Sequence, residues 1–171
     1  MVRAGEVDAF AEIVEHYQSP IIRYLYRLTG DYEMAKDMAQ DTFVQAYKGI
    51  LKTDAELSFR AWLYRIATNN ALQHHRRKKL LSFIPFTERE QNNAATESQM
   101  DRQGKITAIQ EALRKLPYDQ RTCVVLHFVE GFKYREIALT LGISEGAVRK
   151  RVARGRKLFI EEYNRGGGGT E

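Results

Sequence analysis

The chain has 171 residues, of which 27 are Lys or Arg and 22 are Asp or Glu, so its formal net charge at pH 7 is +5. Hydrophobic residues make up 43% and charged residues 29%, which excludes wholesale disorder. No uncharged apolar run reaches the roughly 18 residues of a membrane span, and the acidic start MVRAGEVDAFAEI is unlike a signal peptide. The single cysteine, Cys123, excludes an intramolecular disulfide and a multi-cysteine zinc site. We therefore expect a cytoplasmic, helical and mildly basic protein.

Residues 1–80 show the three- and four-residue spacing of apolar positions that is typical of helices. The first predicted helix has this spacing at Phe10, Ile13, Val14, Tyr17, Ile21, Leu25 and Leu28. It is expected to bend near Pro20, which lacks a backbone donor. A second helix is predicted over about 32–50 and a third over about 58–79, with Ser58 as its N-cap. Strand patterns are absent from the sequence, which therefore predicts an all-α fold.

The second predicted helix has a polar face opposite its apolar one. The residues that spacing places on this polar face are Lys36, Asp37, Gln40, Asp41 and Gln45. A solvated helix surface would have the same composition, so the pattern alone does not identify a binding site.

The third predicted helix interleaves aromatic rings, basic side chains and amides, and ends in the basic run at 76–79. Flat rings stack on unpaired bases, Asn hydrogen-bonds base edges, and a basic cluster holds phosphates, so the mixture is typical of a single-stranded DNA surface. Phe59 and Trp62 are better explained as core residues. The better DNA candidates, which fall off the apolar stripe, are Arg60, Tyr64, Arg65 and Asn69.

Residues 81–105 lack sustained periodicity and are rich in Gln, Asn, Ser, Thr and Glu. That composition is typical of a linker with little core of its own. We therefore predict two small helical domains, 1–80 and 106–164, joined by a flexible linker and followed by a flexible tail over 165–171. The C-terminal part is the more basic one, because residues 106–171 hold 12 basic and 8 acidic residues.

Residues 134–159 carry the strongest pattern in the chain. A short helix is expected to end at Gly142, which can adopt the left-handed geometry of a helix C-terminus. Ser144 is placed to N-cap the next helix, which would bury Val148 and Val152. Two helices joined by a short turn that contains glycine form a helix-turn-helix motif.

The second helix of this motif is strongly basic, since six of the nine residues from 149 to 157 are Lys or Arg and none is acidic. At 100° per residue, the face turned away from Val148 and Val152 carries Gly146, Lys150, Ala153, Arg154 and Lys157, with Arg149 at its edge. Small residues let the helix approach a groove floor, and Arg and Lys supply donors for guanine edges and phosphates. A solvated cationic surface is the alternative, but the position within a helix-turn-helix favours duplex DNA.

Three ordered segments resemble one known family. DMAQDTFVQAYKGI, FRAWLYRIATN and KLPYDQRTCVVLHFVEGFKYREIALTLGISEGAVRKRVARGRKLF are similar to bacterial RNA polymerase sigma factors of the extracytoplasmic-function group (group 4) of the sigma-70 family. The match extends from about Val7 to Phe159. It implies that residues 1–80 bind the polymerase clamp and melt and recognise the −10 element, while residues 106–164 read the −35 element as duplex. The implied partners are core RNA polymerase, through its clamp and flap, promoter DNA, and an anti-sigma factor of a kind that is often membrane-anchored.

The resemblance assigns residues of this chain to three sites. The residues implied to bind core polymerase are Asp37, Gln40, Asp41 and Gln45. Those implied to contact the single-stranded −10 element are Arg60, Trp62, Tyr64, Arg65, Asn69, Asn70, Leu72, Gln73, His74, Arg76 and Arg77. Those implied to read the −35 duplex are Ser144, Glu145, Gly146, Arg149, Lys150, Ala153, Arg154 and Lys157.

Within the −10 set, Asn69 matches the position that captures a flipped base. The specificity loop that follows would contain Asn70, Leu72, Gln73 and His74. The structural alternative for Asn69 is a helix cap, since Asn favours helix ends.

The sequence offers no catalytic constellation, so we expect no enzymatic activity, cofactor or small-molecule substrate. His74 and His75 are adjacent, so on a helix they point about 100° apart and cannot hold one metal together. Cys123 lies in an apolar run and is interpreted as a packing residue. The alternative function is a stand-alone helix-turn-helix regulator that binds duplex operators as a dimer. Capture by core polymerase would discriminate between such a regulator and a sigma factor.

Overall fold

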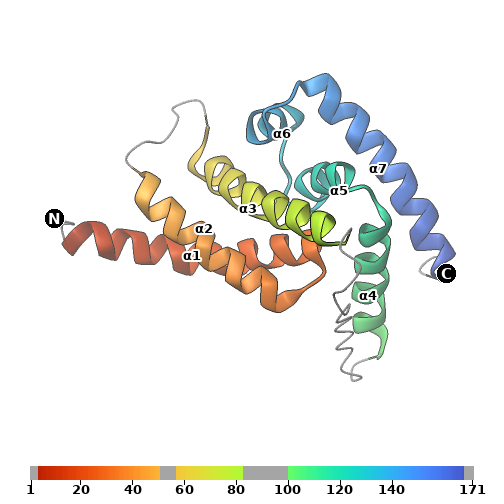
Figure 1. The fold of residues 1–171 in the computed structure, drawn as a ribbon, viewed down its shortest axis with the longest axis horizontal. Helices are drawn as coiled ribbons and strands as arrows, with labels where there is room; N and C mark the ends of the chain where they lie inside the picture. Colours follow the sequence, from red (N-terminus) through yellow and green to blue (C-terminus); the bar gives the residue numbers. More distant parts are fainter. Residues whose placement is uncertain (1–3, 51–56, 83–99, 168–171) are drawn as a thin grey trace.

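The computed structural model describes residues 4–50, 57–82 and 100–167, and all of its regular elements there are helical (Figure 1). In chain order they are α1 (Ala4–Thr29), α2 (Tyr32–Gly49), α3 (Phe59–Leu81), α4 (Met100–Lys115), α5 (Tyr118–Val124), the π-helical turn η2 (Val125–Val129), α6 (Tyr134–Leu141) and α7 (Glu145–Arg165). The predicted all-α fold with a C-terminal helix-turn-helix is confirmed.

The N-terminal half is a three-helix unit in which α2 and α3 both pack on α1. Asp31 caps α2 by accepting a hydrogen bond from the Met34 backbone N at 3.0 Å, and Ser58 caps α3 by accepting from the Ala61 N at 3.1 Å. The helix α1 is continuous across Pro20. The caps lie where the side chains of the sequence favour them, so the starts of α2 and α3 are set locally.

The helix-turn-helix forms as its turn residues predict. Gly142 has φ +66° at the end of α6, and Ser144 caps α7 by accepting from the Ala147 backbone N at 3.1 Å. Farther along α7, Gly155 faces α5, where an added Cβ would lie 2.6 Å from Val124 Cγ2. The absence of a side chain at Gly155 therefore lets α5 and α7 pack closely.

The segment between the two halves differs in part from the predicted linker. The helix α4 begins at Met100, inside the 81–105 segment, and α3 continues to Leu81. Residues 83–99 of the predicted linker and residues 168–171 of the predicted tail lie outside the described residues.

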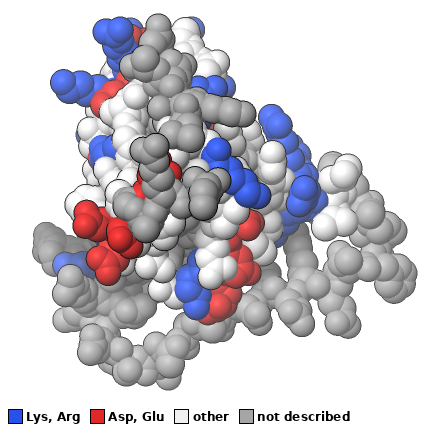
Figure 2. All heavy atoms as spheres, turned by 90° about the vertical axis from the view of Figure 1, so that its left-hand side faces the viewer, with Lys and Arg blue, Asp and Glu red and all other residues white. Residues whose placement is uncertain are grey.

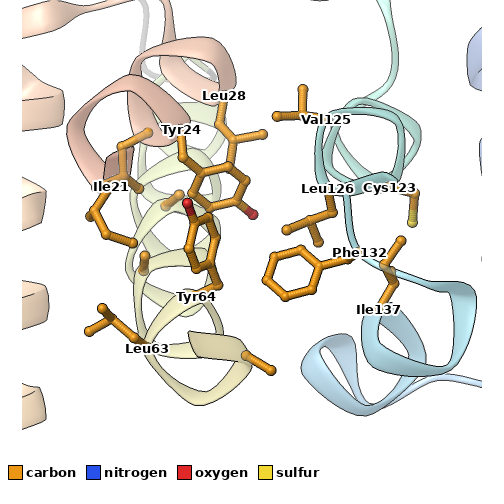
Figure 3. Packing of buried hydrophobic residues seen from close by; sticks show 14 of the residues in the cluster. Ile21, Tyr24, Leu28, Leu63, Tyr64, Cys123, Val125, Leu126, Phe132 and Ile137 are labelled. Atoms are coloured by element: carbon orange, nitrogen blue, oxygen red, sulfur yellow. The ribbon is translucent and has the colours of Figure 1, made fainter. Parts of the chain in front are cut away.

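The two halves share one hydrophobic core. Its labelled members in Figure 3 are Ile21, Tyr24, Leu28, Leu63 and Tyr64 from the first half and Cys123, Val125, Leu126, Phe132 and Ile137 from the second. The helix α3 packs against α6, and α1 contacts α4, α5 and η2. Because a small domain buries a modest fraction of its surface alone, packing the halves together extends the core beyond what either half provides.

Candidate nucleic-acid interface

The basic face of α7 is fully presented to solvent. Each residue predicted for the −35 duplex is exposed: Ser144, Glu145, Gly146, Arg149, Lys150, Ala153, Arg154 and Lys157. Val148 and Val152 are buried on the opposite side, as the helical wheel predicts. The cations of this face are exposed and can contact phosphates or base edges.

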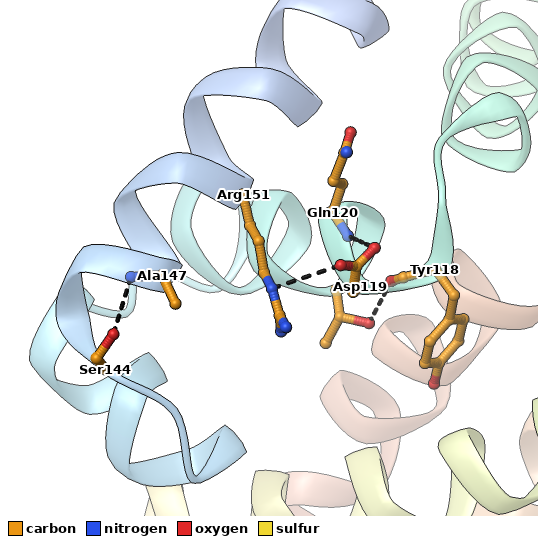
Figure 4. A network of polar contacts seen from close by, with 7 residues as sticks. Tyr118, Asp119, Gln120, Ser144, Ala147 and Arg151 are labelled. Carbon is orange, nitrogen blue, oxygen red and sulfur yellow. Dashed lines mark hydrogen bonds and ion pairs between the residues drawn. The ribbon is translucent and has the colours of Figure 1, made fainter.

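One basic residue of α7 instead faces the protein. Arg151 Nε lies 3.4 Å from Asp119 Oδ2 on α5, and Asp119 Oδ1 also accepts from the Gln120 backbone N at 2.9 Å. Figure 4 shows this pair beside the Ser144 cap. This partly exposed ion pair adds to the burial of Val148 and Val152, which keeps the basic face of α7 turned outward.

The polar face of α2 is also exposed at all four predicted polymerase-binding positions, which are Asp37, Gln40, Asp41 and Gln45. Figure 2 shows one side of the molecule, on which acidic and basic side chains lie in neighbouring groups.

A chain of hydrogen bonds joins α2 to α3. Gln45 Nε2 donates to Asn70 Oδ1 at 3.0 Å, Asn70 Nδ2 donates to Thr42 Oγ1 at 3.1 Å, and Thr42 Oγ1 donates to the Met38 carbonyl at 2.7 Å. Gln45 was predicted for the polymerase and Asn70 for the −10 element. The structure brings these two predicted sites into direct contact.

The predicted −10 residues of α3 divide by exposure. The exposed ones are Arg65, Asn69, Gln73, Arg76 and Arg77. Trp62, Leu72 and His74 are half-buried, and the predicted specificity loop is helical, because α3 extends to Leu81. The capping alternative for Asn69 is wrong, since Asn69 lies in the middle of α3 and Ser82 is the C-terminal cap.

Tyr64 was predicted to lie off the apolar stripe, but it is only 1% exposed. Its hydroxyl donates to Glu130 Oε2 at 2.7 Å, and its ring meets Phe132 edge-on with centroids 5.1 Å apart. Burial raises the pKa of Tyr64, and the charge on Glu130 raises it further. The prediction failed because Tyr64 packs against both Tyr24 of α1 and Phe132 of the C-terminal half, partners that spacing within α3 does not indicate.

Arg60, one turn before Tyr64 on α3, also contacts Glu130 and Phe132. Its Nη2 donates to the Glu130 carbonyl oxygen and lies 3.9 Å from the Glu130 carboxylate. The guanidinium carbon is 4.3 Å from the centre of the Phe132 ring, which favours a cation–π interaction. Arg60 and Tyr64 therefore contact the other half of the protein in this structure.

A second group of contacts between the halves involves residues that sequence reasoning missed. Arg121 Nη1 on α5 donates to the Leu28 carbonyl near the end of α1 at 2.6 Å, and Gln110 Nε2 on α4 donates to the Tyr26 carbonyl at 3.1 Å. The His75 ring of α3 stacks on Tyr118 with centroids 4.4 Å apart. These partners are far apart in the sequence, so no local pattern indicates them.

The described residues hold no group of three or more His, Cys, Asp or Glu side chains that could bind a metal ion. Cys123 is buried, as predicted, and burial raises the pKa of its thiol to about 11. The thiol is therefore protonated at neutral pH and poorly nucleophilic. Within the described ranges no helix is both long and apolar enough to cross a membrane.

Two models of one protein family match the chain in order. The family model for sigma-70 region 2 matches residues 13–80, and the family model for sigma-70 region 4 matches residues 106–159. The chain is 34% identical to the ECF RNA polymerase sigma factor SigW of Bacillus subtilis (strain 168), over 94% of this chain and 92% of the relative.

Two solved structures share the fold. The sigma factor RpoE from Bartonella quintana, solved in complex with the anti-sigma factor NepR, has a TM-score of 0.73 at 24% identity, covering 91% of this chain and 97% of RpoE. CnrH, solved in complex with the cytosolic domain of CnrY, has a TM-score of 0.65 at 25% identity, covering 90% of this chain and 86% of CnrH.

Proposed function

Because this chain belongs to the extracytoplasmic-function RNA polymerase sigma factors of the sigma-70 family, we propose that three of its surfaces divide promoter recognition among them. A sigma factor binds core RNA polymerase and directs it to promoter DNA. We assign polymerase binding and the −10 element to residues 1–80 and the −35 element to residues 106–164, with the segment between α3 and α4 as the linker.

The exposed basic face of α7 is the observation that carries the proposal for the −35 element. Lys150 and Arg154 project from the second helix of a helix-turn-helix, the element that enters the major groove in this class of motif. Gly146 and Ala153 leave room for the groove floor on the same face. A bidentate Arg contact to guanine discriminates against other bases by about 1–3 kcal/mol.

The exposed part of α3 is proposed as the −10 surface. Asn69 presents an amide donor and acceptor, and Arg76 and Arg77 supply cations for phosphates on the next turns. A base captured in this way must first leave the duplex, at a cost of a few kcal/mol that contacts with the captured base must offset. Asn69 is therefore our candidate for base selection, with Arg65 and Gln73 beside it.

The polar face of α2 is proposed to dock on the polymerase clamp. Asp37 and Asp41 lie one turn apart on this face, and both are exposed acceptors for basic groups of a partner. The chain would supply specificity, while the polymerase supplies the chemistry.

We also propose an anti-sigma partner for this chain, in the cytoplasm. RpoE, which shares its fold, was solved with the anti-sigma factor NepR, and CnrH was solved with the cytosolic domain of CnrY.

Transcription by core polymerase with this protein added, followed by sequencing of RNA 5′ ends, tests the function. We expect defined start sites that disappear when the protein is omitted. Arg154→Ala should lower their use, whereas Arg156→Ala, the matched removal of a cation about 160° away around the same helix, should have less effect. Duplex binding as a dimer, with no start sites in the presence of core polymerase, would favour a stand-alone regulator instead.

A further inference from the structure

Tyr134, the first residue of α6, contacts the basic face of α7. Its ring centre lies 5.9 Å from the Cζ atom of Arg149, within the roughly 6 Å at which an aromatic face attracts a cation. Tyr134 is half-buried, whereas Arg149 is exposed. Within the described ranges, no hydrogen bond, ion pair or ring contact holds the other cations of this face, which are Lys150, Arg154 and Lys157. Arg149 differs from them because another helix orients it.

Tyr134 is itself held in place. The His127 ring of η2 lies 4.7 Å, centre to centre, from the Tyr134 ring. His127 Nδ1 donates to the Phe132 carbonyl oxygen at 2.9 Å, and Phe132 is buried. The start of α6 is fixed by the Lys133 backbone N, which donates to Glu136 Oε2 at 2.8 Å. Because the core and the helix start both restrain it, the Tyr134 ring has little freedom to move.

The position of Arg149 on α7 indicates which part of a duplex it would meet. It follows the buried Val148 by one residue, so it lies about 100° around the helix from the buried side. A helix with its side chains is about 10–12 Å across and the major groove is about 12 Å wide. A side chain at this angle therefore meets the wall of the groove, which is a phosphate strand. Lys150, about 200° from Val148, points toward the floor.

We propose that Tyr134 is a positioning residue for promoter binding: its ring holds the Arg149 guanidinium at the edge of the basic face, where the N–H groups of Arg149 bind a phosphate of the −35 duplex. An Arg that packs its flat side on a ring keeps its in-plane donors free for a phosphate. The duplex partner rests on the proposed function. The contact between Tyr134 and Arg149 rests only on the structure.

Orienting Arg149 before DNA arrives lowers the cost of binding. A long side chain loses rotamer freedom when an interface immobilises it, and a side chain that is already ordered loses less. A phosphate contact carries no information about the base sequence. Tyr134 is therefore expected to strengthen binding to −35 duplexes without changing which base is preferred.

The first experiment tests the contact in the full chain without DNA. The NMR signals of the Arg149 δ-methylene group, assigned by their loss in Arg149→Ala, are recorded for the wild type, Tyr134→Phe and Tyr134→Leu. We expect ring-shifted, ordered signals in the wild type and in Tyr134→Phe. Tyr134→Leu keeps an apolar side chain against His127 but has no ring, so its Arg149 signals should be unshifted and mobile. Equal Arg149 signals in all three proteins would overturn the positioning role.

The second experiment measures binding of a promoter duplex by the full chain in complex with core polymerase, at a start site that the pair uses. Tyr134→Leu is expected to weaken binding by about two- to tenfold, from the ordering cost of one flexible side chain, while Tyr134→Phe should bind like the wild type. In an Arg149→Ala background, Tyr134→Leu should have no further effect. In a Lys150→Ala background, the matched control, it should keep its full effect.

The two backgrounds separate positioning from a structural role. Equal weakening by Tyr134→Leu in Arg149→Ala and in Lys150→Ala would show that Tyr134 acts through the fold or touches DNA itself, and would overturn the proposal. A changed preference at one −35 base pair in Tyr134→Leu would overturn the phosphate assignment, because only a base contact alters sequence preference. Failure of the proposed function would instead show as absent start sites, while the Arg149 signals still depend on the Tyr134 ring.

Discussion

At the scale of single residues, the direction of the hydrogen bonds between α2 and α3 is fixed by one hydroxyl. Thr42 donates its only hydroxyl proton to the Met38 carbonyl, so toward Asn70 it can only accept. Asn70 must therefore turn its NH2 group to Thr42 and its oxygen to Gln45, which donates in turn. Asn70 thus holds the Gln45 side chain in one orientation on the proposed polymerase-binding face.

Asn70→Ala is expected to weaken the capture of core polymerase, because Gln45 loses the acceptor that orients it. Net hydrogen bonds contribute about 0.5–1.5 kcal/mol, so we expect a loss in that range or below it at this exposed site. The double variant with Gln45→Ala should lose less than the sum of the two single losses. Affinity for core polymerase, measured by titration, checks this. A changed −10 base preference with unchanged polymerase affinity would instead show that Asn70 acts on DNA.

At the scale of elements, the packing of α7 on α5 depends on Gly155. An added Cβ there would lie 2.6 Å from Val124 Cγ2 and 3.2 Å from the Gln120 backbone oxygen. Because the Gln120 backbone and the buried Val124 side chain both lie against this position, neither can move aside easily to make room for an added Cβ.

Gly155→Ala is therefore expected to lower the free energy of unfolding by about 1–3 kcal/mol, the usual cost of overpacking a core. Ala is the better helix former, so helix propensity alone would predict a gain of up to about 1 kcal/mol. Gly146→Ala on the same helix is the control, since its nearest neighbour would be Ser144 Oγ at 3.9 Å. Denaturant titration of both variants measures the difference. Equal stability of the two would show that α5 and α7 can separate at no cost.

The same elements show what the sequence could predict. The caps at Ser58 and Ser144 and the left-handed Gly142 were predictable because each depends on residues within one turn. The outward face of α7 was predictable because its buried side is fixed by apolar spacing within the helix. The burial of Tyr64 was not, because its partner Glu130 lies 66 residues farther along the chain. Local patterns thus predicted helices and the outward basic face of α7, but not which part of α3 the second half would cover.

At the scale of the whole molecule, the contact between the halves contains a titratable ring. His75 stacks on Tyr118 at an interplanar angle of 13°. Desolvation lowers the pKa of His75, and the positive charge of Arg121 lowers it further, with smaller effects from Lys79 and other basic neighbours on α3. The folded protein therefore favours the neutral imidazole of His75.

This preference makes stability depend on pH in a defined direction. The pKa of His75 lies below its ordinary value of 6.5 in the folded protein, so the unfolded chain binds more protons as the pH falls through about 6.5. The stabilisation is present above that pH and is lost below it. We expect the melting temperature to fall between about pH 7.5 and pH 5.5, and to fall less in His75→Phe, which keeps a flat ring on Tyr118 but cannot be protonated. The carboxylates titrate alike in both proteins, so the difference between their melting curves isolates His75. Parallel pH profiles in the two proteins would show that protonation of His75 does not affect the stability of the folded protein.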